Sequence, residues 1–453
     1  MKSIRWLFFL SIAFFFFALL RSNIANGSLE FGVTNLFVFI LSVSGLMSKR
    51  GSVASLRQVI YVYFVIFFAV MPSYELVNDI YYFDQSFQRE RLYIEANYLC
   101  ILGLFVFSIS SKINLRLDFI YHFINTLESG SRSSLRSNAV QMILVIVICA
   151  VVFSYKQFNV YALIFRGLDD SAVDFEGKNV GQVTFLFMEY FVRPVPAMVL
   201  AYYMFHKRKM GAAIKLTDFN LCILVIFVFI FVSPTGIARF LAAALYIPIF
   251  MLIFQRWAHS KYFFFMLIMV GNFVAMPFLG RFRRYDPNAD NLQLNIKSLE
   301  NGQFDGFYNF SVLVGSDIVT YGEQLMGPLF FYIPRSYWPE KPVGSGTLLA
   351  NTLGLPHSNI AMPYIGEGYI NFGVLGVAIF MFLLGVVVSM LDRFYWFDRV
   401  AGRTSVYSLF YYYFLGYLFF ILRGDLLSST AYMVSGIISL CFVCLFSRWA
   451  HTV

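Results

Sequence analysis

Charged residues are scarce in this 453-residue chain, and their scarcity excludes a water-soluble globule. Only 13% of the residues are Asp, Glu, Lys or Arg, whereas an average soluble domain carries about 25%. Hydrophobic residues stand in continuous blocks such as 219–232 and 262–279, and about 20 apolar residues in a helix cross a ~30 Å hydrocarbon layer. The blocks lack the alternation of apolar and polar residues that a membrane β-barrel requires. The sequence therefore predicts an all-α polytopic membrane protein.

Several motifs of soluble-enzyme chemistry are also absent. The sequence contains no G-x-x-x-x-G-K-[ST] phosphate-binding loop, no H-E-x-x-H zinc motif and no acidic cluster with the spacing of a metal cage. These absences argue against ATP-driven transport and zinc hydrolysis, and they predict a protein without cofactor, metal or nucleotide. The net charge of +9 is explained by anchoring of helices at the cytoplasmic face, so it does not indicate nucleic-acid binding.

Twelve apolar blocks are predicted to be membrane-spanning helices. They lie at 6–20, 31–47, 56–72, 94–111, 139–155, 182–205, 218–233, 237–254, 261–279, 367–391, 405–422 and 426–446. With a cytoplasmic amino terminus, the cytoplasmic segments hold more than half of the 34 Lys and Arg but few of the 25 Asp and Glu. Cations retained on the cytoplasmic side are the expected orientation signal, so we expect both termini inside.

Most of the chain outside the membrane falls on the opposite, outer side, above all in the long segment 280–366. A loop of that size between membrane helices is usually functional or a small subdomain. We therefore divide the chain into helices 1–9 at 1–279, a large periplasmic loop subdomain at 280–366, and helices 10–12 at 367–453. Prolines predict an irregular stretch over 332–346 within the loop.

Ionisable residues at membrane depth are the first candidates for function, because an unpaired charge there costs at least ~2.5 kcal/mol. Glu189 and Arg193 are four residues apart on one helical face. Arg239 follows a tight turn, and Arg423 with Asp425 occupies the short turn before the last helix. The alternatives are a purely structural ion pair for Glu189 and Arg193, and snorkelling to the interface for the other residues.

A second group of cations lies in the large outer loop. Arg281, Arg283 and Arg284 stand where the ninth helix emerges, and Arg335 and Lys341 follow. Positive charge on the outer side runs against the orientation rule. The planar guanidinium group matches phosphate oxygens bidentately, so the cluster suggests a diphosphate site. Solvation of a helix end is the alternative interpretation.

A general base is suggested by the distribution of histidine. His357 is the single histidine on the predicted outer side, and a neutral imidazole can accept a proton from an attacking hydroxyl. Glu367, at the mouth of the tenth helix, is the competing candidate. Each also has a simpler interpretation, as a loop histidine without a role and as a carboxylate near a helix amino terminus.

Two outer segments resemble a known family. The segment 331–342 reads F-Y-I-P-R-S-Y-W-P-E-K-P, and 365–376 reads I-G-E-G-Y-I-N-F-G-V-L-G. With the P-T-G-I-A-R turn that ends at Arg239, the 281–285 cluster and the L-R-G-D turn that ends at Asp425, they resemble the bacterial O-antigen polymerases, the Wzy-type oligosaccharide repeat-unit polymerases. A more distant similarity links the chain to the enterobacterial common antigen polymerase.

The resemblance implies a GT-C-like membrane glycosyltransferase in the bacterial inner membrane, with its active site facing the periplasm. Such an enzyme would transfer a growing glycan from undecaprenyl diphosphate to the sugar hydroxyl of another undecaprenyl-diphosphate-linked repeat unit. The implied partners are these two lipid-linked substrates, the lipid bilayer and a chain-length-regulating co-polymerase. We expect five arginines to bind the diphosphates or the glycan, namely Arg193, Arg239, Arg281, Arg335 and Arg423. His357 is the expected base and Glu367 the second candidate.

Three other functions compete with this interpretation. An O-antigen ligase shares the helical plan and the arginine and histidine chemistry, but it passes glycan to the lipid A core. A lipid-linked oligosaccharide flippase or other secondary transporter would place charges along a central cavity and keep its outer loops short. A purely structural membrane scaffold would leave Arg193, Arg239 and His357 freely replaceable.

Overall fold

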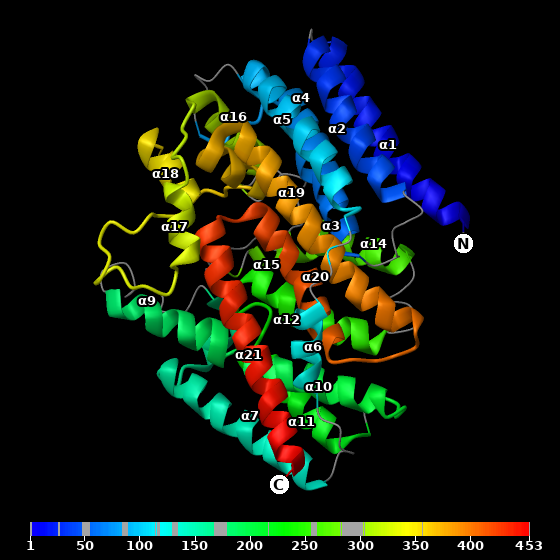
Figure 1. Cartoon of the computed structure of the whole chain (residues 1–453), viewed down its shortest axis with the longest axis vertical. Coiled ribbons are helices and arrows are strands. Elements are labelled where there is room, and N and C mark those ends of the chain that lie inside the picture. Colours follow the sequence, from blue (N-terminus) through cyan, green and yellow to red (C-terminus); the bar gives the residue numbers. More distant parts are fainter. Residues whose placement is uncertain are drawn as a thin grey trace.

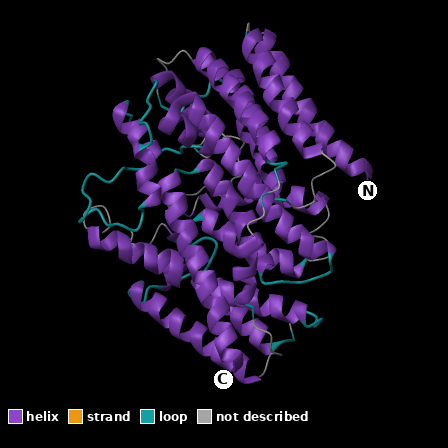
Figure 2. Cartoon of the chain, viewed as in Figure 1, coloured by secondary structure: helices purple, strands orange, loops and turns teal. Residues whose placement is uncertain are grey.

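The structure is a computed structural model that describes most of the chain. The residues it describes are 2–25, 28–47, 55–83, 89–113, 115, 118–128, 135–166, 179–215, 217–254, 261–280, 282, 302, 304–355 and 357–452. Every regular element among these residues is helical (Figure 2). The predicted all-α class is therefore confirmed for this part of the chain.

The helices of the amino-terminal part, up to residue 209, include two π-helical segments labelled η. They are α1 (Lys2–Ala25), α2 (Leu29–Met47), α3 (Leu56–Tyr63), η1 (Phe64–Val70), α4 (Met71–Val77), α5 (Arg89–Ser110), α6 (Asp118–Thr126), α7 (Leu135–Tyr155), α8 (Val160–Ile164), α9 (Asn179–Phe185), η4 (Leu186–Val192) and α10 (Val195–Lys209).

The remaining helices include one further π-helical segment. They are α11 (Phe219–Phe231), α12 (Arg239–Ile253), α14 (Lys261–Val270), η5 (Gly271–Ala275), α15 (Met276–Gly280), α16 (Gly306–Ser316), α17 (Glu323–Leu329), α18 (Ser345–Thr352), α19 (Tyr364–Val400), α20 (Tyr407–Arg423) and α21 (Leu426–Thr452).

Several helical segments are long and apolar enough to cross a membrane. The described residues contain seven, Leu29–Met47, Leu56–Val77, Arg89–Ser110, Asn138–Tyr155, Val183–Lys209, Tyr364–Val400 and Leu426–Ala450. Shorter apolar helices occupy Ala13–Ile24, Phe219–Phe231, Arg239–Ile253 and Met266–Gly280. The chain is thus a multi-pass helical membrane protein, whereas the number of twelve spans stays a prediction.

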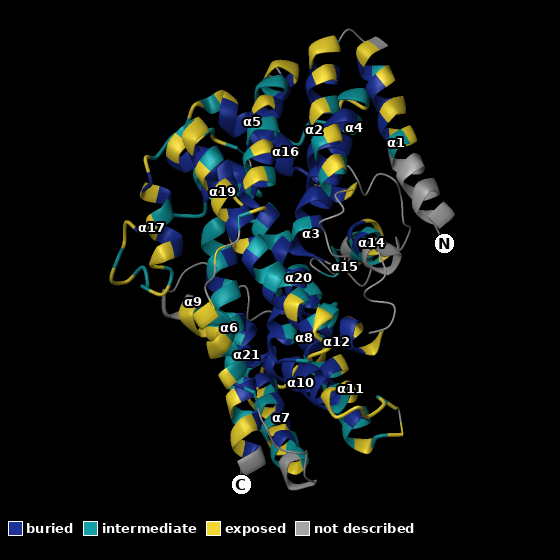
Figure 3. Cartoon of the chain, turned by 45° about the vertical axis from the view of Figure 1, so that its right-hand side comes forward, coloured by how far each residue is buried: buried dark blue, intermediate teal, exposed yellow. Residues whose placement is uncertain are grey.

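Burial increases from the peripheral helices towards a centre formed by α3, α10 and α20 (Figure 3). The peripheral helices expose apolar side chains on the surface of the bundle. Examples are Ile143 on α7 and Phe229 on α11, with exposed fractions of 60% and 70%. Such surfaces suit lipid contact. In the centre α12 packs against α20, and a Cβ at Gly416 would lie 2.4 Å from the carbonyl oxygen of Ala243. Glycine at this position therefore permits the close approach of the two helices.

Each π-helical segment ends two residues before a proline. Pro72 follows η1, Pro194 follows η4 and Pro277 follows η5. Proline lacks a backbone N–H and its ring clashes with the carbonyl four residues back. A widened turn relieves this conflict, because the residue before the proline bonds five residues back, as in Arg193 N to Met188 O at 2.9 Å. Wide turns of this kind often occur at functional sites.

The tenth predicted span, 367–391, differs from expectation at its beginning. Within α19, Phe372 (φ −145°, ψ 23°) and Gly373 (φ 59°) leave the helical conformation, and a positive φ is readily adopted only by glycine. A Cβ at Gly376 would lie 1.9 Å from the carbonyl oxygen of Gly368, so the two glycine backbones are in contact across this break. The expectation of an uninterrupted helix from 367 was wrong, because the break separates 364–371 from the long helix that follows.

The described part of the segment 280–366, which was predicted to be a large outer loop, contacts the bundle. Helix α16 packs against α5 and α19, and α17 packs against α21 and α19. Figure 1 places α16, α17 and α18 at the upper left, whereas the N and C labels lie at the right and at the bottom. Residues 332–344 form no helix, as their prolines predicted. The predicted irregular stretch was too long at its end, because 345 and 346 already belong to α18.

Candidate functional site

A pocket of about 290 Å³ lies where α12, α20 and α21 meet. Each of the three π-helical segments among the described residues contributes a residue to it, Phe67 from η1, Tyr190 from η4 and Asn272 from η5. We call it the arginine pocket after its cations. Its other lining residues are Arg166, Arg239, Phe240, Gly302, Asp305, Asn359, Ile360, Ala361, Gly416, Phe419, Phe420, Arg423, Gly424, Asp425, Ser428 and Tyr432.

Three arginines converge on this pocket from distant parts of the sequence. Arg166 follows α8, Arg239 is the first residue of α12, and Arg423 is the last residue of α20. The lining side chains also include two carboxylates, those of Asp305 and Asp425, so cations outnumber anions. The amino terminus of α12 adds the positive end of its helix dipole. An anionic ligand therefore suits the pocket.

Arg423 is oriented by contacts across the pocket. Its Nη2 donates to the carbonyl oxygen of Gly302 at 2.6 Å and to Asp305 Oδ1 at 3.1 Å, while its buried Nε has no hydrogen-bond partner among the described residues. Burial raises the pKa of Asp305, and the neighbouring Arg423 opposes part of that rise. The pair thus holds one guanidinium group at the pocket with donor capacity to spare.

Asp425 is the second carboxylate of the pocket. Its Oδ1 accepts a hydrogen bond from the backbone N–H of Ser428 at 2.8 Å, a typical contact at the start of a helix. Burial raises the pKa of Asp425 from its ordinary value. A carboxylate with a raised pKa is a stronger base than an exposed one.

Four aromatic rings form one wall of the pocket. Tyr190 and Tyr432 stack with centroids 3.8 Å apart and planes at 3°, and Phe240 and Phe420 stack at 3.7 Å and 12°. The planes of Phe240 and Tyr432 differ by only 1°. The rings come from η4, α12, α20 and α21, and such stacking adds stability beyond burial. The wall therefore keeps these four elements in a constant arrangement beside the arginines.

Only some of the site residues predicted from the sequence meet in this pocket. Arg239 and Arg423 line it together. Arg281 lies outside the described residues, as do Arg283 and Arg284. The residues missed by sequence reasoning are chiefly Arg166, Asp305 and the aromatic wall. Arg166 was hidden because it stands in a loop rich in acidic residues.

Arg193 is fully buried beside the pocket rather than in its lining. Its Nε donates to Phe231 O at 3.0 Å, its Nη1 to Glu189 Oε2 at 2.7 Å and its Nη2 to Leu163 O at 2.9 Å. Lys156 Nζ also lies 2.5 Å from Glu189 Oε1. Glu189 and Arg193 thus form the buried ion pair that was the alternative interpretation of these residues.

The contacts of Arg193 continue to Arg166. Leu163 belongs to α8, and the next residue, Ile164, accepts a hydrogen bond from Thr235 Oγ1 at 2.5 Å. The backbone N–H of Arg166 in turn donates to Thr235 O at 3.2 Å. A Cβ at Gly236 would lie 1.9 Å from Leu163 O, so this turn requires glycine. Arg193 therefore supports the segment that carries Arg166 to the pocket.

The two predicted bases lie near the pocket but do not line it. His357 is exposed, and Asn359, two residues later, lines the pocket instead. Glu367 is only 2% exposed, and its oxygens accept hydrogen bonds from Ser345 Oγ at 2.7 Å and from Leu426 N at 2.8 Å. Glu367 thus contacts the start of α21, next to Asp425.

Arg335 contacts its own loop. Its Nη1 donates to Lys341 O and its Nη2 to Pro342 O at 3.0 Å, while Lys341 Nζ donates to Phe331 O at 2.7 Å and Ile333 O at 2.9 Å. Burial and the nearby Arg335 lower the pKa of Lys341. These two cations therefore close the loop 331–342 on itself.

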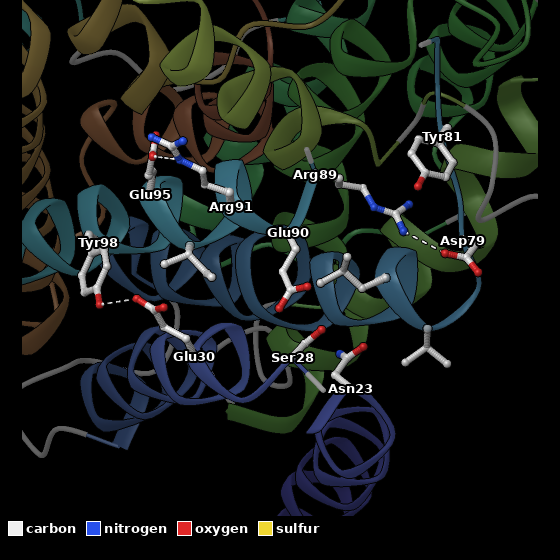
Figure 4. Close-up of a pocket in the computed structure, with 13 residues that line it drawn as sticks. Asn23, Ser28, Glu30, Asp79, Tyr81, Arg89, Glu90, Arg91, Glu95 and Tyr98 are labelled. Carbon is white, nitrogen blue, oxygen red and sulfur yellow. Dashed lines mark hydrogen bonds and ion pairs between the residues drawn. The ribbon is translucent and has the colours of Figure 1, made fainter. Parts of the chain in front are cut away.

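A larger, open cavity of about 880 Å³ lies between α1, α2, α4 and α5. Its arginines are already paired, since Arg89 Nη2 lies 3.0 Å from Asp79 Oδ1 and Arg91 Nε lies 3.0 Å from Glu95 Oε1 (Figure 4). Glu30 and Glu90 add further negative charge. This cavity is therefore less suited to a phosphate ligand than the arginine pocket.

Residues 354–452 match the family model described as O-antigen polysaccharide polymerase Wzy. The matched region includes α19, α20 and α21, and with them Asn359, Arg423, Asp425 and Tyr432 of the pocket. Over these residues the match supports the resemblance noted in the sequence. No curated protein and no solved structure matches the chain.

Proposed function

We propose that this protein is an O-antigen polymerase of the Wzy type, whose family model matches residues 354–452, and that it binds the diphosphate of a lipid-linked glycan in the arginine pocket. It transfers the growing glycan from undecaprenyl diphosphate to a sugar hydroxyl of another undecaprenyl-diphosphate-linked repeat unit. The family match supports a polymerase in general. The observation that carries the specific proposal is the convergence of Arg166, Arg239 and Arg423 on one pocket.

The arginines suit the charge that develops during transfer. The hydroxyl oxygen of the acceptor sugar attacks the anomeric carbon of the donor glycan and forms the new glycosidic bond. The bond from that carbon to the diphosphate oxygen breaks, and the electron pair leaves with undecaprenyl diphosphate. Preorganised cations stabilise charge that builds up in the transition state. Because diphosphate is a good leaving group, we propose that neither a metal nor a nucleotide is needed.

The hydroxyl proton needs an acceptor, and Asp425 is the base that we propose. It lines the pocket, and its burial raises its pKa, as suits a general base. His357 is the second candidate because it precedes the pocket residue Asn359 by two positions. Glu367 uses both oxygens to accept hydrogen bonds from Ser345 and Leu426, so we assign it to positioning the start of α21.

The roles of Arg193 and Arg335 in this proposal differ from those expected from the sequence. Arg193 is a positioning residue that acts through Leu163 on Arg166. Arg335 maintains the loop 331–342 through Lys341 and Pro342. The proposed orientation has both termini in the cytoplasm and the arginine pocket open to the periplasm, because cations favour cytoplasmic segments.

A reconstituted polymerase assay tests the proposal. Purified full-length protein is mixed with undecaprenyl-diphosphate-linked repeat units and a chelator, and the products are separated as a ladder of lengthened glycans. Arg239→Ala and Arg423→Ala should each lower the rate by about a hundredfold to a thousandfold. Arg91→Ala is the matched control because Arg91 lies on the exposed surface of α5, paired with Glu95. No ladder with the unaltered protein, or undiminished ladders with both pocket variants, would contradict the proposal.

A deletion strain separates the proposed polymerase from the ligase alternative. Loss of a polymerase leaves lipopolysaccharide capped with a single repeat unit, whereas loss of a ligase leaves the bare core. We expect the single-repeat product. Bare core would assign the arginine pocket to a ligase reaction instead.

A further inference from the structure

An apolar groove of about 700 Å³ runs along α21 beside the arginine pocket. One wall is the α9–η4 segment, with Phe187 and Phe191, and the other is α21, with Ser435 and Ile438. The loop 331–335 and Lys341 cover one end. We call this cavity the α21 groove.

The walls of the α21 groove are apolar and partly open. Phe187 and Phe191 stack with centroids 5.1 Å apart, and Phe187 and Ile438 are each 53% exposed. The α21 side chains at 427, 431, 435 and 438 repeat every three or four residues, so they share one face of the helix. The groove therefore offers a continuous surface to an apolar chain.

Charge is confined to the covered end of the groove. Arg335 and Lys341 are the charged residues among its lining, and both donate to backbone carbonyls of the loop 331–342. Their donors are thus engaged in holding the cover in place. Any anionic part of a ligand in this region is better served by the adjoining arginine pocket.

The groove and the arginine pocket adjoin each other. Ser428 and Tyr432 line both cavities. From Leu427 the groove follows α21 to Ile438, a distance of about 16 Å at 1.5 Å per residue. A ligand with a head in the pocket could therefore extend an apolar tail directly into the groove.

We propose that the α21 groove holds the isoprenoid tail of the lipid whose diphosphate binds in the arginine pocket. The inference rests on the proposed function of that pocket. Lipid tails are as apolar as leucine side chains, so in a membrane the groove contributes mainly orientation. It aligns the tail with α21 and brings the attached diphosphate to the level of Arg239 and Arg423. An ordinary membrane lipid lacks the diphosphate that links the two cavities.

The probes that test this inference are farnesyl diphosphate and inorganic pyrophosphate, with the purified full-length protein in detergent. Ser435→Phe fills the groove next to Tyr432, and Ile438→Trp fills its far end. Each variant should lower the affinity for farnesyl diphosphate by about tenfold. Its affinity for pyrophosphate should stay within about twofold of that of the unaltered protein. Unchanged pyrophosphate binding also shows that the variant has folded.

Two controls separate filling from other effects. Ser435→Ala removes the hydroxyl that donates to Ala431 O without filling the groove, and Leu445→Trp adds bulk on α21 outside the groove at a residue that is 50% exposed. Both should bind farnesyl diphosphate and pyrophosphate as the unaltered protein does. Equal control behaviour also accounts for partition of the probe into detergent.

The outcomes distinguish the groove from the pocket. Selective loss of farnesyl diphosphate in both filling variants supports the inference. Suppose that pyrophosphate binds to the unaltered protein. If the filling variants then lower the affinities for both probes equally, or change neither affinity, the groove does not hold the tail. If pyrophosphate fails to bind the unaltered protein, the proposed function of the arginine pocket is wrong, and this inference is withdrawn with it.

Discussion

The guanidinium Nη2 of Arg193 donates to the backbone carbonyl oxygen of Leu163 at 2.9 Å, across 30 positions of sequence. The same side chain binds Phe231 O and pairs with Glu189, so it ties α8 and α11 to η4. Arg166, three residues after Leu163, then lines the arginine pocket. A buried ion pair therefore has a consequence for the candidate site, because it supports the segment that carries one of its cations.

A double-mutant cycle tests this support. Arg166→Ala and Arg193→Lys should each weaken pyrophosphate binding by about tenfold, and the double variant should be no weaker than either single variant. Lysine keeps the charge next to Glu189 but cannot reproduce the three-way fork of donors. Isothermal titration of the four proteins measures the coupling. Additive losses would mean that Arg193 does not act through Arg166, and Arg193→Met measures the purely structural cost by thermal unfolding.

Gly236 gives an independent test of the same segment. A Cβ at this position would lie 1.9 Å from Leu163 O, a backbone atom that cannot rotate away. Gly236→Ala should therefore destabilise the protein by about 1–3 kcal/mol and lower polymerase activity. Gly271→Ala is the matched control, since a Cβ at Gly271 meets no atom within 4 Å. Thermal unfolding in detergent measures the difference, and equal stability of the two variants would show that the turn can relax.

The carboxylate of Asp305 contacts Arg423, so we expect it to compete with the proposed diphosphate for this guanidinium group. Asp305 Oδ1 accepts from Arg423 Nη2 at 3.1 Å, and its negative charge faces the same pocket. Asp305→Asn keeps the shape and removes that charge, so pyrophosphate should bind about threefold to tenfold more tightly at low ionic strength. The gain should shrink as salt is added. Weaker binding in Asp305→Asn would indicate instead that the carboxylate is needed to orient Arg423.

The pH dependence of transfer identifies the base. A general base works in its deprotonated form, so kcat/KM falls as the pH drops through its pKa. Because burial raises the pKa of Asp425, the midpoint of this fall should lie at a higher pH than the ordinary aspartate pKa of about 3.9. Asp425→Asn should lower kcat by about a hundredfold or more. His357→Ala should leave kcat and the fall of kcat/KM at low pH unchanged. If the fall of kcat/KM at low pH is absent in His357→Ala, His357 is the base.

Local patterns predicted a substantial part of this molecule. The apolar blocks predicted helices. The four-residue spacing of Glu189 and Arg193 suggested an ion pair as the alternative to a diphosphate site, and the structure contains that ion pair. The predicted outer positions of Arg239 and Arg423 marked them as candidates, and they line one pocket. The L-R-G-D turn belongs to the region that matches the Wzy family model.

Other features escaped sequence reasoning for physical reasons. The prolines after η1, η4 and η5 were visible, but whether a helix kinks, stops or widens at a proline depends on its neighbours. The break at Phe372 and Gly373 lies within a continuous apolar pattern. His357 was favoured as the single outer histidine, whereas the described pocket takes Asn359 from the same segment.

The sequence by itself determined the structural class of this protein and the set of ionisable residues available for its site, because hydrophobicity and charge spacing are local properties of the chain. Only the tertiary structure decided which arginines share a pocket, since Arg166, Arg239 and Arg423 are brought together by the packing of α12, α20 and the segment held by Arg193. It also decided that Arg193 and Arg335 donate hydrogen bonds to backbone carbonyl oxygens. A guanidinium group donates to whichever acceptors the fold brings within reach, and the residues next to it in the sequence do not determine which acceptors these are.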